Sequence, residues 1–372
     1  MLEQLKKTFP LCADRLPCRF WDEMRTSANL SEAIAGFPGQ VAEFVERPGC
    51  AGCLPDLARV ELARERLRNR RHDAASAEEE LQINPSLELL EVAWSPLLPL
   101  LDGELVEPQP ASQLLAFWRH PRSGRQRWAL ATAEELLALK MVAEQLDPQQ
   151  VAATTGRPVG VIDAILEKGV NMGLLLSPPS RLMRDDGFPV PENTPGKFLQ
   201  AEVFTLQWHI TQRCNLHCRH CYDRSECADV DLARGLETLD QLRAFCLRHQ
   251  VGGHVTFTGG NPFMHPDFFD LYQAARDRNL SLAILGNPVT EGELDALLQI
   301  ARPAFFQVSL EGLEEHNDSI RGRGNFSAIL DFLDLLRSKG VYSMVMLTLT
   351  RGTLDQVLPL AERLRDRVDL FT

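Results

Sequence analysis

The sequence lacks the features that mark membrane, secreted and nucleic-acid-binding proteins. Across 372 residues no unbroken apolar run approaches the about eighteen residues that a bilayer span requires, and the N-terminal region holds no apolar signal segment. Positive charge is also scarce: 39 Lys and Arg stand against 51 Asp and Glu, and the net charge of −12 disfavours phosphate backbones. We therefore expect a cytoplasmic protein that binds neither membranes nor nucleic acid.

Cysteine is not scarce, and its nine copies fit a reducing compartment better than a disulfide scaffold. Four of them lie near the N-terminus: Cys12, Cys18, Cys50 and Cys53. Cys50 and Cys53 have the C-x2-C spacing of zinc sites, and the other two would complete four ligands. One such pair is weak evidence, because ordinary buried or free thiols show the same spacing. The role of these four cysteines stays open.

A second group of cysteines carries a more specific pattern. Cys214, Cys218 and Cys221 form C-x3-C-x2-C directly after a strand-like run that ends at Thr211. Three thiolates on one loop can hold three irons of a [4Fe–4S] cluster and leave the fourth iron open to a small molecule. The spacing therefore predicts a reactive cluster site rather than a closed electron carrier.

The N-terminal half divides into two predicted regions. Residues 1–110 are expected to be mostly helical. In residues 111–186, a hairpin pattern surrounds Pro121 to Gly124, and Thr132 to Glu135 form a capping box that starts a helix. Helices predicted over 148–156 and 158–168 complete a winged helix-turn-helix. Residues 187–200, rich in proline and glycine at their start, are predicted to be a linker.

Winged helices often bind DNA, but the third helix of this one lacks the excess positive charge that DNA binding requires. Residues 157–168 contain two basic residues, Arg157 and Lys168, and two acidic residues, Asp163 and Glu167. No Asn, Gln or Ser is present to contact bases. The module resembles the winged-helix peptide-recognition domain of enzymes that modify ribosomally made peptides. That resemblance implies a leader peptide added as an extra strand to the wing and resting on the third helix. A purely structural packing role is the alternative.

Residues 201–372 alternate strand-like and helical patterns. The strand-like runs are 204–211, 254–258, 281–286, 305–310, 342–350 and 368–372. Such alternation predicts an α/β fold with parallel strands, here a partial (βα)6 TIM-like barrel that ends within strand 6, with chemistry at the carboxyl ends of the strands.

The cysteine motif and the strand ends together resemble the radical S-adenosylmethionine (SAM) superfamily. Thr258-Gly-Gly-Asn-Pro262 is similar to the family's Gly-Gly-Glu-Pro segment, with Asn261 in place of the usual Glu, and Ser309-Leu-Glu-Gly312 is similar to Ser-Leu-Asp-Gly. The resemblance implies a [4Fe–4S] cluster on Cys214, Cys218 and Cys221, and SAM as second cofactor. It implies SAM contacts from His220, Tyr222, Gly259, Gly260, Asn261, Pro262, Asn287, Ser309, Glu311 and Arg321. No catalytic residue beyond the cluster ligands is assigned.

Within that superfamily the motifs look most like the peptide- and protein-maturase (SPASM-type) branch. The Gly-Gly-Asn-Pro-Phe variant is similar to the selenobiotic or thio(seleno)oxazole peptide maturases. The resemblance implies reductive SAM cleavage, hydrogen abstraction from a precursor peptide, and a reductant such as flavodoxin or ferredoxin. Relatives carry a C-terminal cysteine-rich extension, so we expect a truncated chain of reduced activity. The alternatives are a sulfatase-activating type of maturase and an iron–sulfur-sensing winged-helix regulator.

Overall fold

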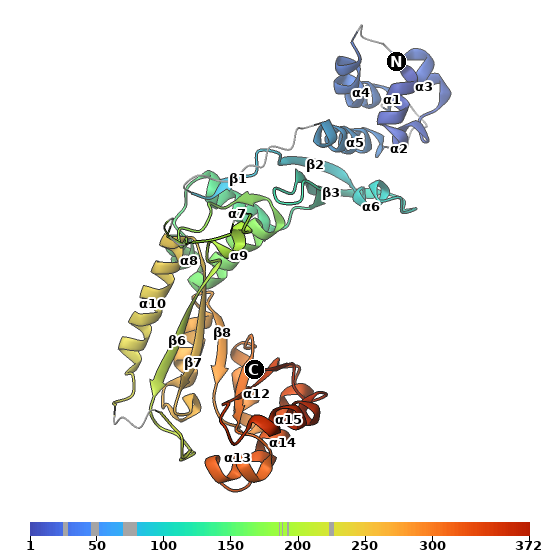
Figure 1. Cartoon of the computed structure of the whole chain (residues 1–372). Helices are drawn as coiled ribbons and strands as arrows, with labels where there is room; N and C mark the ends of the chain where they lie inside the picture. Colours follow the sequence, from blue (N-terminus) through green and yellow to red (C-terminus); the bar gives the residue numbers. More distant parts are fainter. Residues whose placement is uncertain are drawn as a thin grey trace. The chain divides into compact units, whose positions relative to one another are not determined.

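The computed structural model describes residues 1–24, 29–45, 52–69, 80–185, 187, 189–191, 193–222 and 227–372. The chain divides into two compact units, residues 1–148 with 165–179 and residues 149–164 with 180–372. Figure 1 gives the elements in chain order. Cys50, parts of the region 1–110 that was expected to be mostly helical, and parts of the predicted linker lie outside the described residues.

The first unit begins with helices around an aromatic core. These helices are α1 (Leu2–Thr8), α2 (Pro10–Ala13), α3 (Cys18–Glu23), α4 (Leu30–Val45) and α5 (Leu54–Asn69). Phe9 and Phe37 stack with ring centroids 4.1 Å apart, and Phe20 packs edge-on against Phe37. Glu61 of α5 is fully buried, and its carboxylate accepts the backbone N–H groups of Leu11 and Cys12 at 2.8 and 3.0 Å. The predicted helical character of this region is confirmed.

A three-stranded antiparallel sheet follows and contains the predicted hairpin. Its strands are β2 (Glu88–Ser95), β3 (Gln109–Arg119) and β4 (Gln126–Leu130), in the order β2-β3-β4, with α6 (Leu98–Leu101) in the β2–β3 connection. The short strands β1 (Gln82–Ile83) and β5 (Leu175–Leu176) pair separately. The hairpin of β3 and β4 was predicted, whereas β2 was not. Because β2 pairs with β3, the sheet extends across the boundary expected at residue 110.

Three helices complete the helix-turn-helix pattern, α7 (Ala133–Ala143), α8 (Pro148–Thr155) and α9 (Val159–Met172). The capping box is confirmed, because Thr132 and Glu135 satisfy each other's backbone N–H groups. The boundary between the compact units runs through α9, so α8 and the first part of α9 belong with the C-terminal unit. Within that unit Asp163 pairs with both Nε and Nη2 of Arg243 on α10, at 2.7 and 2.9 Å. The domain boundary expected at residue 186 stays a prediction.

The second unit is built from alternating strands and helices. Its strands are β6 (Val203–Thr211), β7 (Gly252–Gly259), β8 (Ser281–Leu285), β9 (Phe306–Leu310), β10 (Ser343–Leu347) and β11 (Leu370–Phe371). Its main helices are α10 (Leu232–His249), α11 (Phe268–Arg276), α12 (Glu291–Ile300), α13 (Glu314–Arg321), α14 (Asn325–Ser338) and α15 (Val357–Leu364). Short 3₁₀ turns occur at Gly196–Phe198, Pro262–Met264 and Leu354–Gln356.

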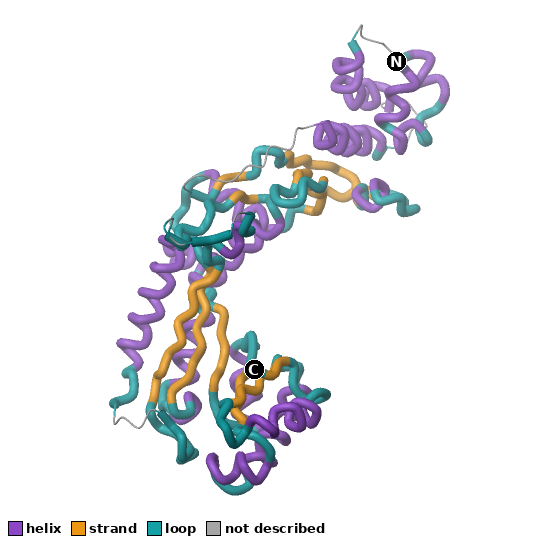
Figure 2. Tube along the Cα trace, viewed as in Figure 1, coloured by secondary structure: helices purple, strands orange, loops and turns teal. Residues whose placement is uncertain are grey.

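All six strands of this unit lie parallel, in the order β11-β10-β9-β8-β7-β6. The α/β fold and the partial TIM-like barrel are thereby confirmed, and Figure 2 shows the strands with their connecting helices. Parallel strands joined by helical crossovers place all their carboxyl ends at one edge. The loops after β6, β7, β8 and β9 therefore gather at the same end of the sheet.

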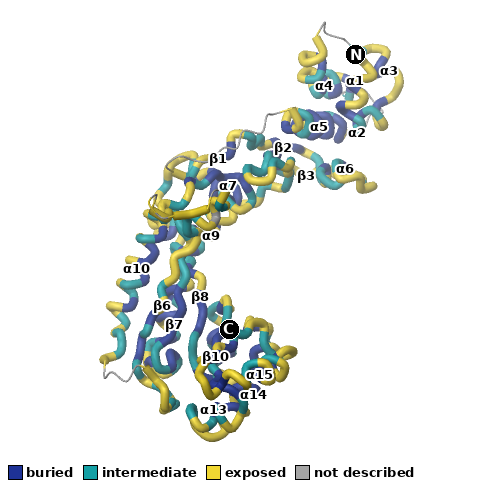
Figure 3. Tube along the Cα trace, viewed as in Figure 1, coloured by how far each residue is buried: buried dark blue, intermediate teal, exposed yellow. Residues whose placement is uncertain are grey.

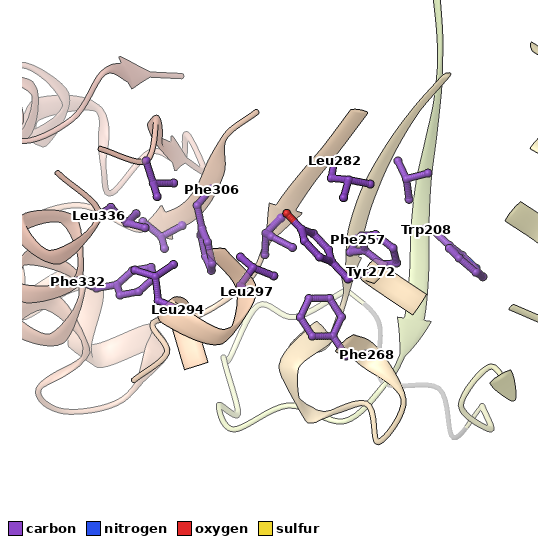
Figure 4. Close-up of a cluster of buried hydrophobic side chains, with 14 of the residues drawn as sticks. Trp208, Phe257, Phe268, Tyr272, Leu282, Leu294, Leu297, Phe306, Phe332 and Leu336 are labelled. Atoms are coloured by element: carbon purple, nitrogen blue, oxygen red, sulfur yellow. The ribbon is translucent and has the colours of Figure 1, made fainter. Parts of the chain in front are cut away.

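The core of the second unit lies between the sheet and its helices. Figure 4 shows Phe257, Tyr272, Phe306 and Phe332 among the side chains that fill it. Phe257 and Phe306 are fully buried, and Figure 3 shows the buried run along β7. Burying each such ring contributes roughly 1.5–3 kcal/mol by area removed from water. This packing makes the strand ends a rigid platform for the loops that follow them.

Candidate functional site

The three clustered cysteines lie on the loop that follows β6. Cys214 and Cys218 are partly exposed, and Cys221 is exposed. The Cys221 N–H donates to the Cys218 carbonyl at 3.2 Å, which closes a tight turn between these two residues. The Cys214 sulfur accepts hydrogen bonds from the Leu216 N–H at 3.5 Å and from Asn287 Nδ2 at 3.3 Å. Such donors stabilise a thiolate.

This cysteine loop is anchored at its start and again among the cysteines. At its start, Asp229 accepts from Thr211 Oγ1 at 2.5 Å and pairs with Arg213 Nε at 2.9 Å. Further along, the Arg219 N–H donates to the Ile320 carbonyl of α13 at 2.9 Å. The loop is therefore fixed to β6 on one side and to α13 on the other, which limits how far its sulfurs can move.

The chemistry of the donor set fits a cluster. Three cysteines on one loop can hold three irons of a [4Fe–4S] cubane and leave the fourth iron open. Among the described residues no group of three His, Cys, Asp or Glu side chains is arranged to hold a single metal ion. Burial raises the pKa of the Cys218 thiol, the Arg321 guanidinium offsets part of that rise, and Cys214 and Cys221 add to it. Metal coordination would supply the positive charge that three neighbouring thiolates need.

Gly259 and Gly260 let the end of β7 pass very close to this loop. A Cβ on Gly260 would lie 2.2 Å from the Arg213 carbonyl oxygen, and one on Gly259 would lie 2.1 Å from that of Thr211. Gly259 also has φ +126°, which side chains rarely adopt. The Gly260 N–H donates to the Thr211 carbonyl at 2.8 Å. Only glycine fits this approach, so the turn and the cysteine loop form one unit.

Three asparagine amides meet beside Cys214. Asn215 follows β6, Asn261 follows β7 and Asn287 follows β8. Asn215 Oδ1 accepts from Asn287 Nδ2 at 2.7 Å and from Asn261 Nδ2 at 3.2 Å. Asn261 and Asn287 are 3% and 8% exposed, and Pro262 is buried at the start of the next turn. We call these three residues the amide cluster.

Glu311, Arg321 and His220 form a second polar group. Glu311 is 1% exposed, and its Oε1 accepts from Arg321 Nε at 3.0 Å and Nη2 at 2.6 Å. His220 Nε2 lies 3.1 Å from the same oxygen. Arg321 was expected to direct its forked donors at the SAM carboxylate, but Nε and Nη2 face Glu311, which leaves its other donors for a ligand. The pair also fixes His220 between two cysteines.

Two expected contacts lie further from these groups. The Tyr222 side chain is 85% exposed, and its hydroxyl lies 3.4 Å from His209 Nε2. Ser309 occupies β9 one residue before its end, opposite Met346 of β10. Ser309 thus lies near the carboxyl end of β9, whereas Tyr222 belongs to the loop after β6, next to Cys221.

The interpretation of the sequence missed Asn215 and Asp229. Asn215 lies inside the Cys-Asn-Leu motif, between the cluster ligands Cys214 and Cys218, and this position could have indicated a role in the site. Asp229 carries no such signal, because its partners Thr211 and Arg213 are separated from it by the loop itself.

A cavity of about 570 Å³ borders the amide cluster. Its wall includes Asn215 and Asn261, and the rest comes from the turn at Pro262–Met264, the loop between β8 and α12, the first turn of α12, and α14. The cavity therefore lies between α14 and the loops that follow β6, β7 and β8. None of the helices in the described ranges combines the length and apolar character that crossing a bilayer requires.

Comparison with known proteins points to one family. Residues 208–364 match the model described as the radical SAM superfamily. Fe-coproporphyrin III synthase of Methanosarcina barkeri is 29% identical over 169 residues, covering 43% of this chain and 41% of that protein. Mycofactocin maturase MftC of Mycobacterium ulcerans is 29% identical over 175 residues, covering 42% of this chain and 44% of that protein. The chain thus spans about two-fifths of each relative.

Among solved structures, Streptococcus suis SuiB bound to S-adenosylmethionine has a TM-score of 0.39 and 13% identity, and the match covers 70% of this chain and 59% of that one.

Proposed function

We propose that the chain is a radical SAM enzyme that modifies a ribosomally made peptide, because residues 208–364 match the radical SAM superfamily. The [4Fe–4S] cluster and SAM are the cofactors of this family. The observation that carries the proposal is the loop after β6, where three cysteines lie beside the glycine turn of β7. The residues that would hold the cluster are Cys214, Cys218 and Cys221.

The strand ends would hold SAM around the cysteine loop. Gly259 and Gly260 bring bare backbone to the place where the SAM amino group would bind. In related motifs a Glu follows the glycines, and here the buried amide of Asn261 takes that position. Arg321 and Ser309 remain candidates for the carboxylate and ribose, with His220 and Tyr222 near adenine. Pro262 and Glu311 would support these contacts rather than make them.

The chemistry divides between cofactors and protein. When bound, the reduced cluster supplies the electron that cleaves SAM, which yields methionine and a 5′-deoxyadenosyl radical able to take hydrogen from carbon. The chain's own residues would bind the methionyl end of SAM, orient its ribose and exclude water at the strand ends. A flavodoxin or ferredoxin would donate the electron.

A peptide substrate is favoured by the open edge of the wing. β4 ends the three-stranded sheet, and among the described residues no strand pairs with its outer side. The His120 N–H donates to the Arg125 carbonyl, and the Ala131 N–H donates to that of Leu114. By antiparallel alternation, the backbone groups of residues 126, 128 and 130 point to the free edge. An extended leader peptide could pair there as a fourth strand.

The regulator alternative fits the structure poorly. A DNA-reading helix presents its N-terminal residues to base edges. In this chain the start of α9 is engaged by the C-terminal unit, where Asp163 binds Arg243 and the Gly160 N–H donates to the Asp277 carbonyl at 2.7 Å. A Cβ on Gly160 would lie 2.2 Å from the Asn279 nitrogen, so this contact is close.

A tetrapyrrole substrate is the second candidate, because Fe-coproporphyrin III synthase is as similar as the mycofactocin maturase, at 29% identity each. Each match covers about two-fifths of the chain, and the equal identities do not separate the two substrates. The winged module favours the peptide over both the tetrapyrrole and a sulfatase-type protein substrate.

Anaerobic reconstitution with iron and sulfide, followed by dithionite and SAM, tests the enzyme. The expected product is 5′-deoxyadenosine, and it should be absent when Cys218 is replaced by Ala. A protein that holds its cluster and makes no 5′-deoxyadenosine would contradict the proposal.

Binding of a synthetic leader, taken from a short open reading frame beside the gene, tests the peptide. Leu130→Pro removes an edge N–H, whereas Leu130→Ala removes only the side chain, which is 46% exposed. We expect the Pro variant to weaken binding at least tenfold and the Ala variant to change it little, as measured by fluorescence anisotropy. Equal affinities of both variants and the wild type would exclude strand addition at β4.

A further inference from the structure

The amide cluster aims a hydrogen-bond donor at one cysteine sulfur. Asn287 Nδ2 lies 3.3 Å from the Cys214 sulfur and 2.7 Å from Asn215 Oδ1. The two hydrogens of that nitrogen are thus both used, one by the sulfur and one by the neighbouring amide. Because Asn287 is 8% exposed, water competes little for either bond.

The two other amides fix which way Asn287 points. Asn215 Oδ1 accepts from Asn261 Nδ2 at 3.2 Å as well as from Asn287, so it serves as acceptor for both neighbours. Asn261 is held in turn, because its Oδ1 accepts the Phe263 N–H at 3.3 Å. If Asn287 were flipped, its oxygen would face both a sulfur acceptor and an oxygen acceptor. The network therefore selects the donor end of Asn287 for Cys214.

This network also gives a reason for asparagine at position 261. A carboxylate there cannot donate to Asn215 Oδ1, and it would add negative charge next to the cysteine loop. The amide of Asn261 donates and carries no charge. Replacing the Glu of the related Gly-Gly-Glu-Pro motif by Asn261 therefore removes a negative charge near the cluster, which makes its reduced state easier to form.

We propose that Asn287 is a positioning residue that raises the reduction potential of the cluster through its N–H···S bond to Cys214, with Asn215 and Asn261 holding the amide in place. The inference rests on the proposed function, since it needs the cluster on these cysteines. One-electron reduction adds negative charge that spreads onto the thiolates. A donor aimed at a thiolate stabilises that reduced state, and hydrogen bonds to the sulfurs are among the factors that set such potentials.

The experiment is a redox titration of the whole chain, reconstituted anaerobically and followed by the electron paramagnetic resonance signal of the reduced cluster. The variants are Asn287→Ala, which removes the donor, and Asn287→Asp, which replaces it with a charged acceptor of the same shape. Gln241→Ala is the control, because that amide bonds Glu237 on the exposed face of α10. We expect a more negative midpoint for Asn287→Ala, a further negative shift for Asn287→Asp, and no shift for Gln241→Ala.

Midpoints of Asn287→Ala and Asn287→Asp equal to that of the wild type, at equal cluster content, would overturn the inference and leave the proposed function standing. A wild-type protein that assembles no cluster would overturn the proposed function itself. If both Asn287 variants lose the cluster, Asn215→Ala decides, because it removes an acceptor that orients Asn287 and leaves Asn287 present. A smaller negative shift in that variant supports the inference, and an unchanged midpoint overturns it.

Discussion

Two glycine-to-alanine changes in the same unit should have opposite effects. At Gly260 the new Cβ would lie 2.2 Å from the Arg213 carbonyl oxygen and 2.7 Å from that of Gln212. Both contacts are with backbone, so no flexible side chain can move aside, and overpacking of this kind costs about 1–3 kcal/mol. At Gly292, in the first turn of α12, nothing lies within 4 Å of the Cβ position. Alanine there should stabilise the unit by about 0.4–1 kcal/mol, because it restricts the unfolded chain.

The expected gap between the two variants is therefore at least about 1.5 kcal/mol in the free energy of unfolding. Urea unfolding under anaerobic conditions measures it, and iron content measured in parallel reports the cysteine loop. Gly260→Ala should also lower iron content, since relief of the clash moves the loop at Arg213, next to Cys214. Equal stability and equal iron in Gly260→Ala and Gly292→Ala would refute the close approach of β7 to the cysteine loop.

Four further changes have definite expected outcomes. Replacing any one of the three cluster cysteines with Ala should abolish the cluster's visible absorbance, whereas Cys246→Ala, in the core, should keep it. Arg243→Ala should cost about 3–5 kcal/mol in urea unfolding because it leaves Asp163 as an unpaired and largely buried charge, and a cost below about 1 kcal/mol would refute the pairing. Thr132→Ala should cost about 0.5–2 kcal/mol through the lost cap. Burial opposes ionisation of Glu135, but hydrogen bonds from Thr132 and the nearby Lys168 hold the pKa of Glu135 below its usual 4.5. Its stabilisation is thus present above pH 4.5 and is lost as pH falls through the lowered value, so Glu135→Gln should lower the melting temperature at pH 7 and not at pH 2.

Much of the fold could be predicted because its helices and strands follow from patterns between residues close in sequence. The six strands of the barrel were each expected within a few residues of their observed bounds, since apolar strand runs alternate with helical spacing. The Thr132 cap and the β3–β4 hairpin are likewise local. β2 was missed because its strand character depends on pairing with β3, which a single segment does not show.

The sequence allowed the residues of the site to be predicted, but not the hydrogen bonds between them. The motif identified the cysteines and Asn287, but the partner of Asn287 is Cys214, 73 residues away. Arg321 was expected to contact SAM, but no sequence pattern indicates that two of its donors bind Glu311. Such pairings arise from the meeting of different strand ends, which only the folded chain defines.

The bond between Asp163 and Arg243 also constrains how this protein could have been assembled from separate genes. A recombination event that joined a foreign winged module at residues 187–200 would remove Asp163. Arg243 on α10 would then lose its ion-pair partner. Exchange is tolerable only if the helix-turn-helix is inherited together with the catalytic half, or if the incoming module has an acidic residue at the position of Asp163. Modular inheritance is therefore expected to break before α8, and not at the proline-rich segment that the sequence suggests as a linker.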